Sequence, residues 1–139
     1  MMIEINNLTK QKTDKKFFST VAKKVLSGED REIKSLSLAL VGKEEIKKLN
    51  KNFRKKNKPT DVLSFELKEV ANKKNEKGYL GEIIICPEVV KENAEKYGVT
   101  VKQEMKRVFV HGIFHLLGYE HERSKKDADI MSKKEEKYL

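Results

Sequence analysis

Features of secreted and membrane proteins are scarce in this sequence of 139 residues. A single cysteine, Cys86, excludes a disulfide bond within the chain. No apolar run reaches the length of about 20 residues that a membrane-spanning helix needs. The N-terminal residues MMIEINNLTK lack the apolar core of a signal peptide. These absences predict a cytoplasmic protein that has no membrane segment.

Internal repeats, low-complexity tracts and long linkers are also absent. A chain of this length can bury a hydrophobic core without disulfide bonds, and a single domain is the usual organisation at this size. We therefore expect residues 1–139 to form one domain.

Apolar residues recur with two different spacings in alternating segments of the chain, which predicts a domain of mixed α and β structure. A period of two indicates about four strands, and a period near 3.6 indicates about five helices. Pro87 is typical of a helix start, and Thr100 with Gln103 forms a capping-box pattern. The predicted strands include residues 3–5, 36–40, 62–67 and 80–86, and the predicted helices cover 17–26, 46–53, 87–97, 101–116 and the segment from 124 onward.

All three histidines lie in one run, HGIFHLLGYEH, at residues 111–121. Residues four apart on a helix share one face, so His111 and His115 can bind one ion, although such a pair alone is more typical of packing or surface residues. Gly118 can end the helix in the left-handed conformation, which lets His121 approach the same ion from outside. Three nitrogen ligands and one open position are typical of a catalytic zinc site. The spacing therefore predicts one Zn²⁺ per chain.

The same spacing occurs in the zinc-protease signature HExxHxxGxxH, but one position differs. That signature follows its first histidine with a glutamate that acts as the general base, whereas Gly112 stands there in this chain. A glycine cannot accept a proton. The metal ligands are therefore expected to serve a different reaction.

The chain carries 31 Lys and Arg against 22 Asp and Glu, a formal net charge of +9, which fits a polyanionic partner such as nucleic acid. A lysine-rich, solvated surface accounts for this excess equally well. The cations are concentrated on one predicted helix, whose apolar side is Ile46, Leu49 and Phe53, and on the segment that follows it up to Pro59. They are Lys47, Lys48, Lys51, Arg54, Lys55, Lys56 and Lys58.

Three motifs together resemble those of the YbeY family of bacterial metal-dependent single-strand endoribonucleases, also described as rRNA maturation factors. HGIFHLLGYEH resembles the family's HGxLHLxGYDH, FRKKNKPTDVLSF resembles YRxxxxPTDVLSF, and GEIIIC resembles the strand motif GDIxIx, in the same order. The resemblance covers essentially the whole chain. The departures are conservative in kind: Phe53 for a frequent Tyr, Glu82 and Glu120 for aspartates, and Phe114 for an aliphatic residue.

The resemblance implies an α/β (α+β) fold in which a small mixed sheet packs with the helices and a central helix carries the HGxxH ligands. It implies a zinc ion held by His111, His115 and His121 beside a basic groove that contains Arg54. The implied function is cleavage of single-stranded RNA in rRNA maturation, at the 3′ end of 16S rRNA, and in ribosome quality control. The implied partners are rRNA and the small ribosomal subunit or its assembly proteins.

Each remaining site residue has a functional and a structural interpretation. Arg54 can bind the scissile phosphate through parallel hydrogen bonds, or it can be a solvated residue at a helix end. Lys55 and Lys58 are further candidates for substrate binding. Asp61 and Glu82 can orient an imidazole or a water, but Asp61 can equally form a turn and Glu82 can lie on a solvated strand face. Cys86 ends an apolar strand, which is more typical of a core residue than of a fourth zinc ligand.

Three functions are therefore compared. The first is a hydrolytic endoribonuclease in which a zinc-bound water or the 2′-hydroxyl of the RNA is the nucleophile. The second is a zinc protease, which would need a base from another segment because Gly112 replaces the glutamate. The third is a ribosome-assembly protein that binds rRNA without cutting it and whose zinc only stabilises the fold. The motifs favour the first.

Overall fold

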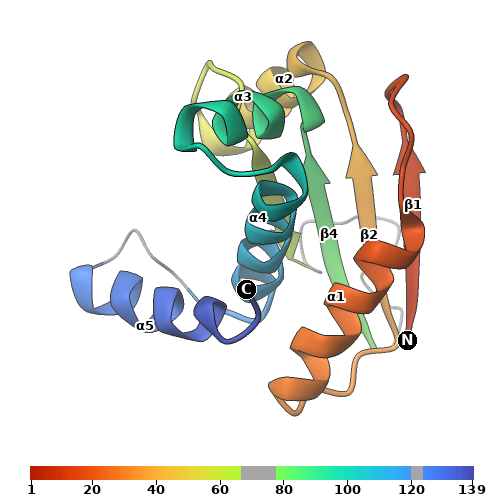
Figure 1. Cartoon of the computed structure of the whole chain (residues 1–139), viewed down its shortest axis with the longest axis vertical. Helices are drawn as coiled ribbons and strands as arrows, with labels where there is room; N and C mark the ends of the chain where they lie inside the picture. Colours follow the sequence, from red (N-terminus) through yellow and green to blue (C-terminus); the bar gives the residue numbers. More distant parts are fainter. Residues whose placement is uncertain (67–77, 120–123) are drawn as a thin grey trace.

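The structure of the protein is a computed structural model that describes residues 1–66, 78–119 and 124–139. Within these ranges it contains four strands and five helices (Figure 1). In chain order they are β1 (Met2–Asn7), α1 (Lys15–Gly28), β2 (Ser35–Leu40), α2 (Lys43–Arg54), β3 (Val62–Glu66), β4 (Tyr79–Ile85), α3 (Pro87–Tyr97), α4 (Val101–Leu116) and α5 (Lys125–Glu136).

The strands form one mixed sheet in the order β1-β2-β4-β3. β1, β2 and β4 are parallel, and β3 pairs antiparallel with β4 at one edge. Helices cover both faces of the sheet, and every residue of the central strand β2 is buried, including its two serines. The predicted small mixed sheet of about four strands with about five helices is confirmed.

Each face of the sheet has its own apolar cluster. Alternate residues of β2 and β4, such as Leu38 and Ile83, pack with α1 and α4 on one face. The intervening residues, such as Ala39 and Ile84, pack with Ile46 of α2 on the other face. Figure 1 shows α1 crossing in front of the parallel strands and α4 running alongside β4, on the side of β3. The helix that carries the histidines is therefore packed directly on the sheet, as predicted.

Local sequence signals determine where the helices begin and end. Thr100 and Gln103 form both hydrogen bonds of the capping box at the start of α4. Ser124 accepts a hydrogen bond from the backbone N–H of Asp127 at the start of α5. Gly98 ends α3 with a φ of 67°, a conformation that costs a glycine little.

α5 is held at the end of α1 by polar contacts around Glu29, in addition to the burial of Met131. The Tyr138 hydroxyl donates to Glu29 Oε2 at 2.5 Å, and Lys134 Nζ donates to Glu29 Oε1 at 3.3 Å. Figure 1 shows α5 below α4, beside the C-terminus. This docking brings the end of α5 next to the histidine-bearing turn of α4.

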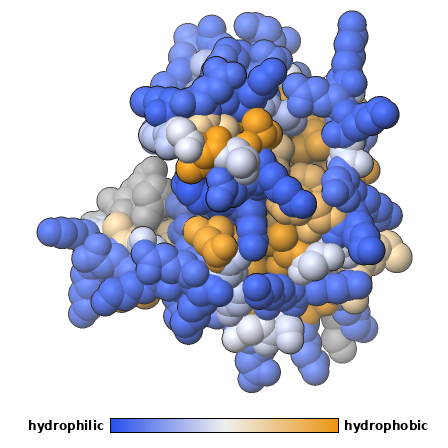
Figure 2. All heavy atoms as spheres, in the orientation of Figure 1, coloured by the Kyte–Doolittle hydropathy of each residue, from blue (hydrophilic) through white to orange (hydrophobic). Residues whose placement is uncertain are grey.

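The outer surface of the helices is mostly hydrophilic, as Figure 2 shows for one face of the molecule. Apolar areas appear between the helices on this face. Among the described residues, no helix has the length and apolar character to cross a membrane.

Candidate metal centre and basic helix end

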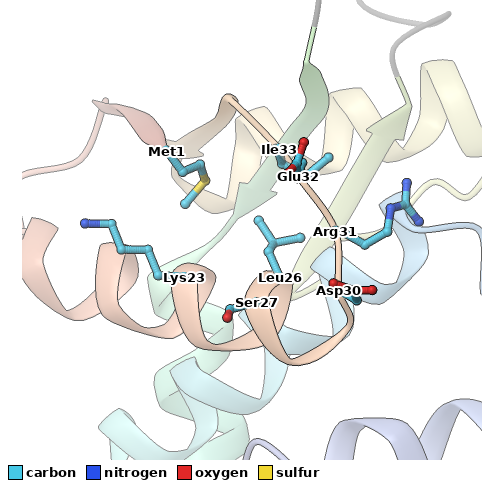
Figure 3. A pocket seen from close by; sticks show the side chains of 8 residues that line it. All are labelled: Met1, Lys23, Leu26, Ser27, Asp30, Arg31, Glu32 and Ile33. Atoms are coloured by element: carbon cyan, nitrogen blue, oxygen red, sulfur yellow. The ribbon is translucent and has the colours of Figure 1, made fainter.

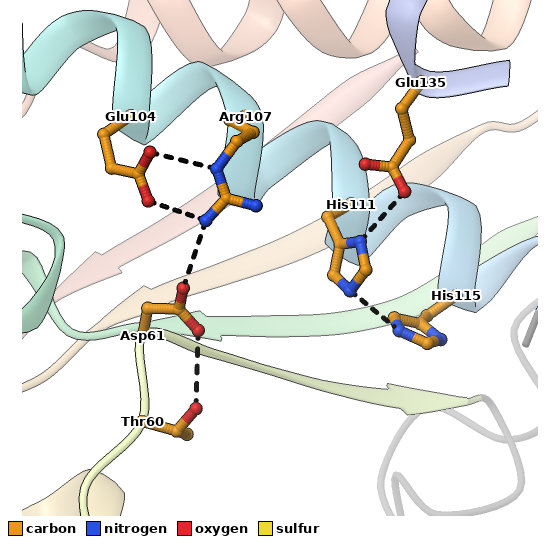
Figure 4. Close-up of polar contacts among 7 residues, drawn as sticks. All are labelled: Thr60, Asp61, Glu104, Arg107, His111, His115 and Glu135. Atoms are coloured by element: carbon orange, nitrogen blue, oxygen red, sulfur yellow. Dashed lines mark hydrogen bonds and ion pairs between the residues drawn. The ribbon is translucent and has the colours of Figure 1, made fainter. Parts of the chain in front are cut away.

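α4 brings two of the three histidines together. His111 and His115 are one turn apart, and their ring centroids are 4.6 Å apart with the rings nearly perpendicular. Their Nε2 atoms face each other at 3.1 Å (Figure 4). The predicted pairing of these imidazoles on one helix face therefore matches the geometry of the helix.

Hydrogen bonds on the opposite side of each ring favour one tautomer. His115 Nδ1 lies 3.1 Å from the backbone oxygen of Tyr119, which can only accept, so the ring proton is on Nδ1. His111 Nδ1 lies 2.9 Å from Glu135 Oε1, and an ionised carboxylate also accepts. Both arrangements leave a lone pair on Nε2. The two lone pairs therefore point into the same space.

This donor set fits a zinc ion. Zinc binds histidine nitrogens at about 2.0–2.1 Å in tetrahedral geometry, which places two such nitrogens roughly 3.3 Å apart. The observed separation of 3.1 Å between the Nε2 atoms is close to that value. Two lone pairs at this distance repel each other unless a cation or a proton lies between them. A carboxylate or carbonyl on the far ring nitrogen is the usual support for a metal-bound histidine.

Gly118 reverses the chain directly after α4. Its φ is 99°, its N–H donates to the His115 carbonyl oxygen, and the N–H of Tyr119 donates to the Phe114 carbonyl oxygen. This turn also positions the Tyr119 oxygen that accepts from His115. Gly118 therefore ends α4 in the left-handed conformation, as predicted.

The third predicted ligand, His121, lies outside the described residues, so its role as a ligand stays a prediction. Within the three described ranges, no group of three His, Cys, Asp or Glu side chains could hold a metal ion.

Gly112 brings α4 into close contact with the sheet. A Cβ at this position would lie 3.1 Å from an Ile83 side-chain carbon and 3.2 Å from Ser64 Oγ. Ser64 Oγ also donates to the Gly112 carbonyl oxygen at 3.1 Å. A side chain at this position would require the Ile83 and Ser64 side chains to shift by a few tenths of an ångström. The glycine thus has a packing role that the signature comparison did not reveal.

Arg54, the last residue of α2, is anchored to the edge strand β3. Its Nη2 donates to the Ser64 backbone oxygen at 2.6 Å, and its guanidinium carbon lies 4.8 Å from the centre of the Phe65 ring. Ser64 contacts Arg54 through its backbone and Gly112 through its hydroxyl. One residue of β3 therefore links the predicted phosphate-binding arginine to the histidine-bearing helix.

Lys55 and Lys58 are exposed in the segment that follows Arg54. Lys55 has a φ of 60°, unusual for a residue other than glycine, and its N–H donates to the Lys51 oxygen. Buried Asn50 donates from Nδ2 to the Lys58 carbonyl oxygen at 2.9 Å. The path of this basic segment is therefore defined by backbone contacts, while its lysine side chains extend into solvent.

Of the two carboxylates proposed to support an imidazole, neither makes the contact found at His111. Asp61 lies 3.6 Å from Nη2 of Arg107, whose guanidinium also binds both oxygens of the buried Glu104 (Figure 4). Glu82 alternates along β4 with Ile83, which faces α4, so Glu82 lies on the opposite face of the sheet. Burial raises the pKa of the Glu82 carboxyl.

The carboxylate that does contact His111, Glu135, was missed from the sequence. It lies 24 residues further along the chain, within a helix rich in charged residues, and no motif marks it. Cys86 is buried in the cluster on the α2 side of the sheet, and burial raises the pKa of its thiol. The predicted core role of Cys86 agrees with this position.

A pocket of about 260 Å³ lies elsewhere, at the C-terminal end of α1 (Figure 3). The residues that line it belong to the N-terminus, α1 and the loop before β2. They are Met1, Lys23, Leu26, Ser27, Asp30, Arg31, Glu32 and Ile33. None of them belongs to α4 or to the basic segment, so this pocket is not part of the candidate metal centre.

Comparison with known proteins agrees with these features. Residues 4–139 match the family model described as Endoribonuclease YbeY. A protein named Endoribonuclease YbeY from a Sulfurihydrogenibium species is 43% identical over 117 residues, which are 84% of this chain and 76% of that protein. Another of that name, from Bdellovibrio bacteriovorus, is 37% identical over 92% of this chain and 86% of its own length.

A solved structure is also similar. The solution structure of TM1509 from Thermotoga maritima aligns with a TM-score of 0.65 at 34% sequence identity. The alignment covers 99% of this chain and 86% of that one. The sequence matches and the shared architecture agree with each other along nearly the whole chain. This chain therefore belongs to the endoribonuclease YbeY family.

Proposed function

We propose that this protein is a zinc-dependent endoribonuclease that cuts single-stranded RNA. The observation that carries the proposal is the pair of Nε2 atoms on His111 and His115, 3.1 Å apart, with both far ring nitrogens bonded to acceptors. Family membership supports the nuclease activity, because the relatives are named endoribonucleases. His121 is the proposed third ligand.

The residues around the centre have separate tasks in this proposal. Zinc, when bound, supplies Lewis acidity towards a phosphoryl oxygen and a water of lowered pKa. Glu135 and the Tyr119 carbonyl keep the ring protons on Nδ1, so that each Nε2 stays available as a ligand. Arg54 holds the scissile phosphate and offsets the charge that develops on it, since a guanidinium remains protonated throughout the neutral pH range. The nucleophile is either a zinc-bound water or the 2′-hydroxyl of the RNA.

The proposed biological substrate is precursor rRNA in the cytoplasm, with maturation of the 16S 3′ end and ribosome quality control as the processes served. The small ribosomal subunit or its assembly proteins would present the RNA. A chain with a net charge of +9 and a basic segment beside the centre suits such a polyanionic substrate.

The protease alternative is disfavoured by Gly112, because a glycine stands where the protease signature has its general-base glutamate. The alternative of a non-catalytic rRNA-binding protein predicts the same charge and the same zinc. It differs in one respect: it predicts that the protein binds RNA but does not cut it.

Charge reversal at Arg54 tests the proposal. We expect Arg54→Glu to lower kcat/KM for a single-stranded RNA by about 100-fold or more, since a phosphate contact becomes a repulsion, while zinc content is unchanged. Arg31→Glu, which makes the same charge change in the loop between α1 and β2, is the matched control and should lose little activity. Cleavage of a labelled single-stranded oligonucleotide is measured. Duplex RNA and an unfolded protein are tested in parallel as alternative substrates. Equal activity of the two variants would contradict the role of Arg54, and cleavage of only the protein would exclude the nuclease.

A further inference from the structure

Phe53, next to Arg54 at the end of α2, is unexpectedly exposed. The helical period predicts it on the apolar side with Ile46 and Leu49, and Ile46 is fully buried. Phe53 nevertheless retains 53% of its surface in contact with solvent. The helix thus presents a large apolar ring at its last turn, where most of the neighbouring side chains are charged or polar.

The ring of Phe53 is positioned by packing on one side. Its centroid lies 5.2 Å from that of Phe65, and the planes meet at 74°. Phe65 is itself buried and also lies under the Arg54 guanidinium. The contact restricts the orientation of the Phe53 ring without covering it. An aromatic ring fixed in this way loses little conformational entropy when a ligand stacks on it.

The surroundings of Phe53 are strongly positive. Residues 46–60 contain seven Lys and Arg and no Asp or Glu. Exposed Lys51, Lys55 and Lys56 are within three residues of Phe53 along the chain. An apolar protein partner would have to desolvate these charges, whereas a nucleotide supplies a phosphate for the cations and an aromatic base for the ring. Proteins that bind single strands combine these same two elements.

We propose that Phe53 is a base-stacking subsite, in which one unpaired nucleobase of the RNA lies against its exposed ring while the adjacent phosphates contact Arg54 and Lys55. The inference rests on the proposed function, because it assigns a substrate contact to the same site. A base within a duplex has both faces covered by its neighbours, so this subsite selects unpaired nucleotides. It therefore provides a physical basis for a preference for single strands.

The sequence contains no tryptophan, which allows a direct test. Phe53→Trp gives a single-tryptophan protein whose fluorescence reports stacking. Titration with a 2′-O-methyl oligonucleotide, which resists cleavage, should quench the emission in a saturable way. An oligonucleotide with the same number of phosphates but abasic sugars should quench it little. Leu8→Trp, at an exposed position beyond β1 at the opposite edge of the sheet, is the control and should respond to neither.

Three further variants separate stacking from packing. Phe53→Tyr should bind the oligonucleotide as the wild type does, whereas Phe53→Leu and Phe53→Ala should bind roughly 5- to 150-fold more weakly, the range found for loss of one stacked base. KM for cleavage should rise while kcat changes little. Leucine retains apolar contact with Phe65, so it tests stacking even where alanine loosens the end of α2.

The outcomes distinguish this inference from the proposed function. Cleavage by the wild type, with no quenching of Phe53→Trp and normal affinity of Phe53→Leu, would overturn the stacking subsite and leave the nuclease intact. Absence of any RNA binding or cleavage by the wild type would overturn both. A change in Phe53→Trp emission with protein concentration alone, unaffected by RNA, would show that the ring contacts a second copy of this chain and would also overturn the inference.

Discussion

At the scale of single residues, the candidate centre depends on where the ring protons of two histidines lie. Glu135 and the Tyr119 carbonyl oxygen each accept from a histidine Nδ1, which turns both Nε2 lone pairs towards one point. The side chain of His111 is 21% exposed and that of Glu135 is 11% exposed, so this pair is partly shielded from water. A hydrogen bond to a carboxylate is stronger in such a position than at the open surface.

Replacement of Glu135 tests this support. We expect Glu135→Gln to weaken zinc binding by about 10- to 100-fold, because a neutral amide holds the His111 tautomer less firmly than a carboxylate does. Competition with a chromophoric chelator measures the affinity. Glu136→Gln removes the same charge from the exposed neighbouring residue and should change little. Equal affinities of the two variants would show that Glu135 does not support the metal ligand.

Sequence could identify the histidines but not Glu135, for a physical reason. His111, His115 and Gly118 act through helix periodicity and a helix end, which are local properties of the chain. The contact between His111 and Glu135 depends instead on how α5 docks against α4, 24 residues away in sequence. Asp61 and Glu82 were predicted as carboxylates that could orient an imidazole or a water. In the structure Asp61 lies next to Arg107, and the sheet directs Glu82 to the other face.

At the scale of elements, the end of α2 combines strain with charge. Lys55 adopts the left-handed conformation directly after the helix, where glycine is the usual residue. A lysine in this conformation costs about 1 kcal/mol relative to glycine.

Replacing Lys55 with glycine should change stability and RNA binding in opposite directions. We expect Lys55→Gly to raise the free energy of unfolding by about 1 kcal/mol, because the left-handed strain is relieved. RNA affinity should fall and become less dependent on salt, since one cation is lost. Lys56→Gly is the control: it removes the same charge from a residue without a positive φ, so it should not stabilise the protein. Denaturant unfolding and RNA binding at several salt concentrations measure both effects. A less stable Lys55→Gly protein would contradict the account.

Element boundaries were largely predictable because their signals are local. The capping box at Thr100, Pro87 at the start of α3 and Gly98 at its end act as the sequence indicates. The exposure of Phe53 was not predictable from the helical period. Asn50 takes a buried position on α2 and binds the Lys58 carbonyl oxygen, so polar bonding replaces apolar packing near the helix end.

At the scale of the whole molecule, the candidate metal centre depends on contacts between distant segments. Glu29 at the end of α1 binds Tyr138 and Lys134, and these contacts hold α5 where Glu135 meets His111. Burial alone would raise the pKa of the Glu29 carboxyl. Hydrogen bonds from Tyr138 and Lys134 together outweigh burial and lower that pKa below its ordinary value of 4.5. Burial and the Glu29 carboxylate raise the pKa of Tyr138 to about 12, so its hydroxyl remains a donor at neutral pH.

These shifts predict how stability depends on pH. A carboxyl whose pKa is lowered by folding adds stability above its unfolded pKa, and this stability is lost as the pH falls through the folded value. We expect Tyr138→Phe to cost about 1–3 kcal/mol at pH 7, with a difference from the wild type that shrinks as the pH falls below the ordinary Glu29 pKa of 4.5. Urea unfolding across pH 3–8 measures it. A difference that stays constant over this range would contradict the role of Glu29.

The most direct measurement of the central claim is the metal content and coordination of the wild type and of His115→Ala. The account predicts one zinc per wild-type chain, with three imidazole nitrogens at about 2.0–2.1 Å by X-ray absorption. It predicts that folded His115→Ala loses both the zinc and the cleavage of single-stranded RNA. Full cleavage by a folded, metal-free His115→Ala protein, or zinc held without histidine nitrogens, would contradict it.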